Sequence, residues 1–279
     1  MTIWLSLICG ETKTIIRENE MSKLQAIICL AIFLSNVTFA QAPDTAGISQ
    51  LFKGHDGAFV LYNMTRNEYT RYDTQRCAER FLPASTYKIP NALIGLETGV
   101  IPDSNYIIKW DGKPEPFKEW ERDHDLKSAI YYSVVPYFQE LARRVGRERE
   151  QRWLDTLNYG NKTIGGAVDR FWLDNSLQIS ADEQVEFLKK FYAEQLPFSK
   201  RSMRIVKEIM SSEQHGDAIM KFKTGTGYTG HYIAWLVGYV EKGNDVYIFA
   251  FNIDGKEFNE ASGLRNEIPR EIMKRLSVF

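Results

Sequence analysis

The sequence predicts an α/β (α+β) fold in which a mainly antiparallel sheet comes from both chain ends and is flanked by helices. Three observations predict it. β-rich runs at 57–64 and 68–72 lie near the start of the chain, and apolar β runs at 231–241 and 245–254 lie near its end. Helical periodicity fills the region between them, which predicts an inserted all-helical lobe. No flexible linker separates these parts, so we expect residues 41–279 to form one domain of two lobes.

The first elements follow from local signals. Thr65-Arg66-Asn67 joins the first two strands as a predicted hairpin. A helix is expected over 85–97, because Ile89, Ala92, Leu93 and Leu96 form one apolar stripe and Gly99 follows as a stop signal. Pro90 lies inside this helix, so it must fall in the first turn or kink the helix.

The middle and the end of the chain complete the pattern. An apolar face over 134–145 predicts a helix that ends at Gly146, and Ser180 with Glu183 forms a capping box that opens a helix through Gln195. Further helices are expected from Ser199, with Met203, Val206 and Met210 inward, and over 266–279. Lys242-Gly243-Asn244 predicts a hairpin, and 159–179 reads as a long loop of the kind that often has a function.

Composition excludes several classes of protein. The chain has 279 residues, 44% hydrophobic and 25% charged, which is typical of a globular protein. Its 35 basic and 36 acidic residues are interspersed and give a net charge of −1, so neither a nucleic-acid surface nor a polybasic membrane patch is indicated. We therefore expect a small-molecule partner that binds in a pocket.

The N-terminal region is typical of a secretory signal. Residues 21–40 combine a lysine, an apolar run and a Thr-Phe-Ala end, which predicts a cleaved signal peptide rather than a stable membrane anchor. Residues 1–20 carry charges ahead of this signal. We interpret them as a non-native upstream extension, with translation starting at Met21. The predicted location is the periplasm of a Gram-negative bacterium.

The mature chain would keep one cysteine, Cys77, which cannot form an intrachain disulfide. No histidine pairs recognisably with it in the sequence. We therefore expect a structural thiol, with a nucleophile as the alternative.

Ser85-Thr86-Tyr87-Lys88 places a hydroxyl and an amine on one face of a helix start. Serine becomes a nucleophile when a base removes its proton, and lysine can be that base when burial lowers its pKa. A helix N-terminus also offers backbone N–H donors for an oxyanion. Taken alone, the pair is weak evidence and more often means a capping serine beside a solvated lysine.

Three further motifs follow in order. Ser133-Val134-Val135 begins the central helix, where Ser133 is either an N-cap or a second hydroxyl facing the nucleophile. Tyr159-Gly160-Asn161 heads the long loop. Lys223-Thr224-Gly225 precedes the strand at His231 and reads as a surface turn or as a strand edge that holds a carboxylate.

In this order and spacing, the motifs closely resemble those of the class D (oxacillinase-type) serine β-lactamases, which share Ser-x-x-Lys and Lys-Thr-Gly with the penicillin-binding proteins. The resemblance covers nearly all of residues 50–275. It includes 81–100 and the runs Trp110-Asp111-Gly112, Phe171-Trp172-Leu173 and Gly263-Leu264-Arg265. The resemblance implies the serine β-lactamase/penicillin-binding-protein-like fold and the hydrolysis of β-lactam antibiotics through a serine acyl-enzyme.

The resemblance also implies roles for single residues. Ser85 would be the acylated nucleophile, and Lys88 would be carboxylated by CO2 to N6-carboxylysine, which would act as the general base. Val135, Trp172 and Leu173 would wall this group, with the Trp172 indole N–H bonded to it. Ser133 would pass a proton to the β-lactam nitrogen. The substrate-binding residues would be Lys223, Thr224, Gly225, Thr226 and Arg265, with the backbone N–H groups of Ser85 and Thr226 as the oxyanion hole.

The family more often has phenylalanine at Tyr87 and often tryptophan at Leu236, which affects packing and substrate profile. No metal and no cofactor other than CO2 or bicarbonate is expected, and the protein would be a monomer or homodimer. Two alternatives carry the same motifs. One is a penicillin-sensing or penicillin-binding domain that is acylated without turnover, and the other is a peptidoglycan transpeptidase or carboxypeptidase.

Overall fold

A computed structural model describes residues 47–279 of the chain. The predicted upstream extension (1–20) and signal peptide (21–40) lie outside the described residues. Over the described range, no helix has both the length and the apolar character needed to cross a bilayer.

The centre of the fold is a six-stranded sheet in the order β2-β1-β8-β7-β6-β5, in which every neighbouring pair is antiparallel. Strands from the two ends of the chain therefore meet at the β1–β8 pair, as the sequence predicts. The strands are β1 (Gly57–Asn63), β2 (Glu68–Tyr72), β5 (Ser211–His215), β6 (Ala218–Tyr228), β7 (Tyr232–Lys242) and β8 (Asp245–Gly255), with a separate two-stranded pair of β3 (Arg80–Phe81) and β4 (Ile179–Ser180).

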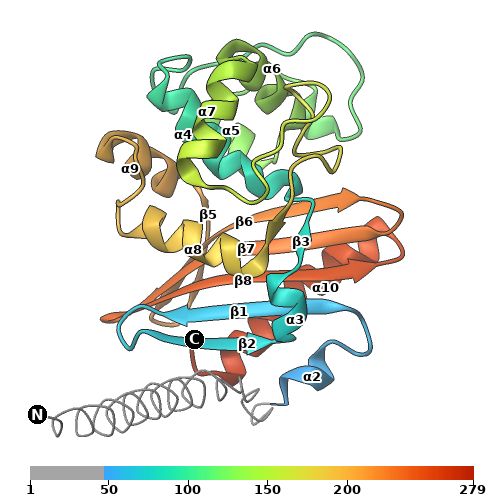
Figure 1. The fold of residues 1–279 in the computed structure, drawn as a ribbon, viewed down its shortest axis with the longest axis vertical. Coiled ribbons are helices and arrows are strands. Elements are labelled where there is room, and N and C mark those ends of the chain that lie inside the picture. Colours follow the sequence, from blue (N-terminus) through green and yellow to red (C-terminus); the bar gives the residue numbers. More distant parts are fainter. Residues whose placement is uncertain (1–46) are drawn as a thin grey trace, which may run out of the picture. The chain divides into compact units, whose positions relative to one another are not determined.

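Helices cover both faces of the sheet (Figure 1). α10 (Phe258–Arg275) packs on one face with α2 (Ile48–Leu51), and α8 (Ala181–Tyr192) packs on the other against β1 and β8. Because both faces are covered, all seven residues of β1 are buried. Val60 joins the core beneath the helical lobe and Phe59 joins the core beneath α10, as the alternation of a strand requires.

The helical lobe is inserted between β3 and β5. It contains α4 (Lys88–Glu97), α5 (Leu126–Tyr131), α6 (Val135–Val145), α7 (Arg147–Leu157) and α9 (Lys200–Ile209), with the single turns η1 (Ala84–Tyr87) and η2 (Lys118–Trp120), while α3 (Thr74–Ala78) lies beside β1. Pro90 lies in the first turn of α4, where its missing N–H breaks no helical bond. The predicted capping box is present: the Ser180 hydroxyl accepts from the Glu183 backbone N–H, and the Glu183 carboxylate accepts from the Ser180 N–H.

Three boundaries differ from the sequence-based expectation. Lys223-Thr224-Gly225 lies inside β6, with Lys223 opposite Val237, instead of preceding the last strands. α10 begins at Phe258 rather than at residue 266 and continues through Pro269. The central helix begins at Val135, and Val134 occupies its N-cap position, so Ser133 does not cap it.

Candidate active site

A cavity of about 340 Å³ lies between the helical lobe and β6. It brings together most of the residues predicted from separate motifs, and its lining includes Ser85, Ser133, Val135, Leu173, Thr224, Gly225, Thr226 and Arg265. Lys88, Trp172 and Lys223 are buried, with exposed fractions of 2% or less. Residues separated by up to 180 positions in the sequence therefore form one site.

Ser85 lies in the single turn η1, directly before α4. Ala84, the residue before it, has φ of 48°, a left-handed conformation that is unfavourable for a side chain with Cβ. Thr86 anchors the turn from within, because its hydroxyl donates to the Pro83 carbonyl at 2.7 Å. This backbone holds Lys88 Nζ 2.7 Å from Ser85 Oγ, within hydrogen-bond distance.

The environment of Lys88 favours its neutral form. The side chain is fully buried, and burial followed by the nearby Lys223 cation lowers the pKa of Lys88 well below its usual range. Its Nζ lies over the Phe138 ring, 5.4 Å from the ring centroid. A neutral amine can accept a proton from Ser85 or react with CO2, whereas an ammonium can do neither.

Ser133 faces the site instead of capping a helix. It adopts φ of 55°, and its Oγ accepts a hydrogen bond of 3.0 Å from Lys223 Nζ. The same ammonium donates to the Thr224 carbonyl at 2.9 Å. Burial, with a smaller effect from the Arg265 cation, lowers the pKa of Lys223 to about 7. A second hydroxyl, that of Ser133, therefore lines the cavity together with Ser85, and a second, buried lysine is hydrogen-bonded to it.

Arg265 reaches the cavity from α10. Its guanidinium donates to Thr226 Oγ1 at 2.6 Å and to the Gly225 carbonyl at 3.2 Å, while its Nε is buried without a partner. Burial lowers the pKa of Arg265 to about 10, so it stays positively charged at neutral pH. Arg265 and Lys223 give the site a positive end that suits a carboxylate.

Gly225 allows β6 to approach η1 closely. A Cβ atom at this position would lie 3.0 Å from the Pro83 carbonyl oxygen and 3.1 Å from the backbone nitrogens of Ser85 and Thr86. Any larger residue would push the strand away from the serine. The glycine of the Lys-Thr-Gly motif therefore brings the strand backbone up to the nucleophile.

Trp172 is fully buried, and its indole Nε1 has no hydrogen-bond partner. A buried N–H without an acceptor is rare in a folded protein and marks a place where a group is expected to bind. The residue after it, Leu173, and Val135 both line the cavity beside Ser85. Of the three residues predicted to wall the Lys88 group, two thus line the cavity with Ser85 and the third, Trp172, carries a buried donor without a partner.

Three aromatic side chains line the cavity beside the predicted residues, and no sequence motif marked them as part of the site. They are Phe117, Trp120 and Phe258, with the Phe117 ring 4.9 Å from Trp120 and 6.2 Å from Phe258. Phe117 and Phe258 remain 42% and 40% exposed. The sequence signal was an aromatic pair within four residues at 117–120, far from any catalytic motif.

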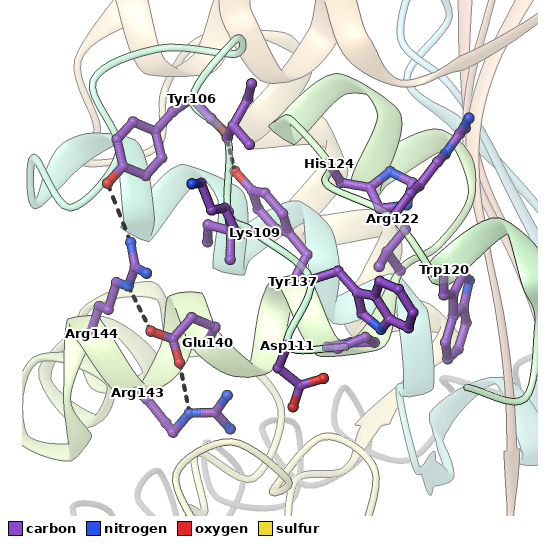
Figure 2. Close-up of a pocket in the computed structure, with 15 residues that line it drawn as sticks. Tyr106, Lys109, Asp111, Trp120, Arg122, His124, Tyr137, Glu140, Arg143 and Arg144 are labelled. Atoms are coloured by element: carbon purple, nitrogen blue, oxygen red, sulfur yellow. Dashed lines mark hydrogen bonds and ion pairs between the residues drawn. The ribbon is translucent and has the colours of Figure 1, made fainter. Parts of the chain in front are cut away.

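A second cavity of about 330 Å³ is lined by residues of the segment 106–111 and of α6 (Figure 2). It shares Trp120 with the first cavity and contains none of the predicted site residues. Glu140 pairs there with Arg143 at 3.0 Å and with Arg144 at 2.7 Å. No serine–lysine pair is present in its lining.

Two remaining motifs are structural. Asn161 binds the Ser176 carbonyl and the Gln178 backbone N–H, so Tyr159-Gly160-Asn161 fixes the loop that carries Trp172. Cys77 is fully buried, its thiol contacts the Tyr72 carbonyl at 3.1 Å, and burial raises the pKa of this thiol to about 12. Such a thiol is a poor nucleophile, which agrees with the structural interpretation.

Comparison with known proteins agrees with this geometry. The penicillin-binding protein transpeptidase domain matches residues 56–274. The chain is 43% identical over 240 residues to β-lactamase OXA-5 of Pseudomonas aeruginosa, covering 84% of this chain and 90% of that one.

Solved structures give the same result. FUS-1 (OXA-85), a class D β-lactamase from Fusobacterium nucleatum, superposes with a TM-score of 0.80 at 38% identity, covering 84% of this chain and 98% of that one. The C-terminal domain of the BlaR penicillin receptor of Bacillus licheniformis gives 0.79 at 36% identity, covering 83% and 95%. The chain therefore belongs to the class D serine β-lactamases, enzymes built on the penicillin-binding transpeptidase domain.

Proposed function

We propose that the protein hydrolyses β-lactam antibiotics through an acyl-enzyme on Ser85, with a carboxylated Lys88 as the general base, and so confers antibiotic resistance. The observation that carries the proposal is the 2.7 Å contact between Ser85 Oγ and a fully buried Lys88 Nζ. Membership of class D supports β-lactam hydrolysis as the reaction.

The surroundings of Lys88 fit a carbamate. The amine is kept neutral by burial, and the unpartnered Trp172 N–H offers a donor to a buried carboxylate. Val135 and Leu173 would exclude water from one side. When bound to Lys88 Nζ, CO2 would supply a carboxylate base next to Ser85. No metal is needed for this chemistry.

Ser85, Ser133 and Lys223 have separate roles in acylation. Ser85 Oγ gives its proton to the base at Lys88 and attacks the carbonyl carbon of the β-lactam, and the C–N bond of the ring breaks. Ser133 Oγ passes a proton to the departing nitrogen, with Lys223 Nζ holding the hydroxyl in position. Water then attacks the ester carbonyl, which frees Ser85 and releases the ring-opened acid.

Substrate binding is assigned to the positive end of the cavity. Arg265, Lys223 and Thr224 would hold the carboxylate of the antibiotic, while Thr226 and the backbone at Gly225 align its acyl side. The backbone N–H groups of Ser85 and Thr226 would form the oxyanion hole, because β6 approaches η1 so closely at Gly225.

Removal and restoration of CO2 tests the base. Degassed enzyme should lose most of its turnover of a chromogenic cephalosporin, and added bicarbonate should restore it. Lys88→Ala should be slow in acylation and deacylation and should gain nothing from bicarbonate. Full activity in rigorously CO2-free buffer would contradict the proposed base.

The similarity to the BlaR receptor domain supports a second candidate, a sensor that is acylated and stays acylated. Such a domain would react once per molecule with a penicillin. Counting the product molecules released per enzyme separates the two candidates, because only a hydrolase exceeds one.

We also propose that residues 21–40 direct the protein to the periplasm and are removed there. N-terminal sequencing of the exported protein should begin near residue 41. A precursor that yields a peptide from residues 2–20 would contradict the start at Met21.

A further inference from the structure

Tyr87 and Glu150 form a buried pair that the proposed reaction does not use. The Tyr87 hydroxyl donates to Glu150 Oε2 at 3.0 Å, and both side chains have an exposed fraction of 0%. The pair joins η1, immediately before Lys88, to α7. A carboxyl group in an apolar core is costly to bury, so its place here calls for an explanation.

The tyrosine ring supports the wall of the site. Tyr87 stacks on Trp172, with ring centroids 5.5 Å apart and an interplanar angle of 24°. Phe171 meets both rings edge-on, at 5.0 Å from each. Any shift of the Tyr87 ring is therefore passed to the indole whose N–H is unpartnered.

Glu150 fixes this ring, and its charge state matters. Burial raises the pKa of Glu150 to about 8, so the carboxyl is mostly protonated at neutral pH. Among the described residues none forms a salt bridge with it, and its hydrogen-bond partner Tyr87 is a phenol with a raised pKa. The Arg149 guanidinium, whose charge lowers the pKa of Glu150 less than burial raises it, is bound to the carbonyls of residues 144 and 145, and Lys88 is held neutral.

We propose that Tyr87 and Glu150 act as a positioning pair that holds Trp172 against the carboxylated Lys88, and that Glu150 must be uncharged to do so. This inference rests on the carboxylated lysine proposed above. An ionised Glu150 would place an unpaired negative charge behind Trp172. That charge would disfavour a second anion on Lys88 and favour the ammonium that cannot react with CO2.

The pH dependence of carboxylation tests the pair. The bicarbonate concentration for half-maximal carboxylation is measured by 13C NMR of protein in labelled bicarbonate, for wild type and Glu150→Gln. Glutamine keeps an acceptor for Tyr87 and cannot ionise. Dividing the wild-type concentration by the Glu150→Gln concentration cancels the pH dependence of CO2 itself. This ratio should rise about tenfold between pH 7 and 9, because the neutral fraction of a group with a pKa of about 8 falls about tenfold over that range.

A double-variant cycle tests the pairing separately. Tyr87→Phe and Glu150→Met should each lower the melting temperature and raise the bicarbonate requirement, since each leaves a buried polar group alone. The double variant should recover much of both losses, because it replaces the pair by apolar groups of similar shape.

Three results would overturn the inference. A ratio that stays constant from pH 7 to 9 would show that the charge of Glu150 has no effect on Lys88. Strictly additive losses in the double variant would show that the two residues are uncoupled. The absence of any carbamate signal, in wild type as in every variant, would instead overturn the carboxylated lysine itself and the role of the pair with it.

Discussion

Replacement of Trp172 by phenylalanine isolates the single hydrogen bond on which the carboxylated lysine depends. The indole N–H has no partner within the described part of the chain, so Trp172→Phe removes no internal hydrogen bond. The smaller ring loses about 1–2 kcal/mol of packing, and removal of an unsatisfied buried donor offsets a similar amount. The stability of the unmodified protein should therefore change little.

Carboxylation of Lys88 should respond strongly to the same change. A hydrogen bond to a charged group contributes about 1.5–3 kcal/mol. Loss of the bond from the Trp172 indole N–H would therefore destabilise the carboxylated form of Lys88 by this amount and leave the uncarboxylated form unaffected. Because 1.4 kcal/mol corresponds to a factor of ten, the bicarbonate concentration for half-maximal turnover should rise about 10- to 150-fold.

The assay is a bicarbonate titration of cephalosporin turnover in degassed buffer. Trp153→Phe is the matched control, since Trp153 stacks on Phe198 at 4.4 Å outside the cavity and should leave the titration unchanged. A Trp172→Phe enzyme with the wild-type bicarbonate requirement would refute the role of the indole N–H.

Four further results are expected. Ser133→Ala should reduce the acylation rate about 10²- to 10⁴-fold, measured by stopped flow, if Ser133 passes the proton. Arg265→Ala should raise KM and also raise the pKa of Lys223 above about 7, since the neighbouring cation that helps lower it is gone; the pH profile of kcat/KM would show both. Ser180→Ala should lower the free energy of unfolding by about 1 kcal/mol in urea, with kcat unchanged, because it removes only the α8 cap. Glu150 binds its proton more tightly in the folded state, so wild-type stability falls as pH rises from about 4.5 to about 8; relative to wild type, Glu150→Gln should gain about 1.4 kcal/mol per pH unit in this window, measured by urea unfolding.

Elements with strong local signals were predictable from the sequence. The hairpin at Lys242-Gly243-Asn244 is present, with Lys242 paired to Asp245 and Gly243 at φ of 57°, because a tight turn needs residues that tolerate positive φ. The capping box at Ser180 is also present, because its two hydrogen bonds depend only on residues three positions apart in the sequence.

Elements that depend on tertiary contacts were not predictable. β5 has no apolar alternation, and it is held as an edge strand by pairing with β6. The Lys-Thr-Gly segment was compatible with a surface turn or a strand edge, and only the structure shows that it lies within a strand between β5 and β7. α10 begins eight residues earlier than expected, because its packing on β7 and β8 outweighs the low helix propensity of Gly263 and Pro269.

The residues of the site also divide into those that a sequence motif marks and those that only the folded structure brings together. The order of the motifs was enough to choose Ser85, Lys88, Ser133 and Lys223, and the structure brings these residues together. The Tyr87–Glu150 contact joins residues 63 positions apart with no motif to mark it. Only the folded arrangement of η1 and α7 reveals it.

Intact mass spectrometry of the protein during reaction with a penicillin tests the central claim most directly. The account predicts an adduct on Ser85 that appears within the first turnovers, disappears as substrate is consumed, and is accompanied by many product molecules per enzyme. A stable adduct on Ser85 with one equivalent of penicillin consumed would contradict hydrolysis and identify a sensor or penicillin-binding domain. Turnover without any Ser85 adduct, retained in Ser85→Ala, would contradict the acyl-enzyme mechanism itself.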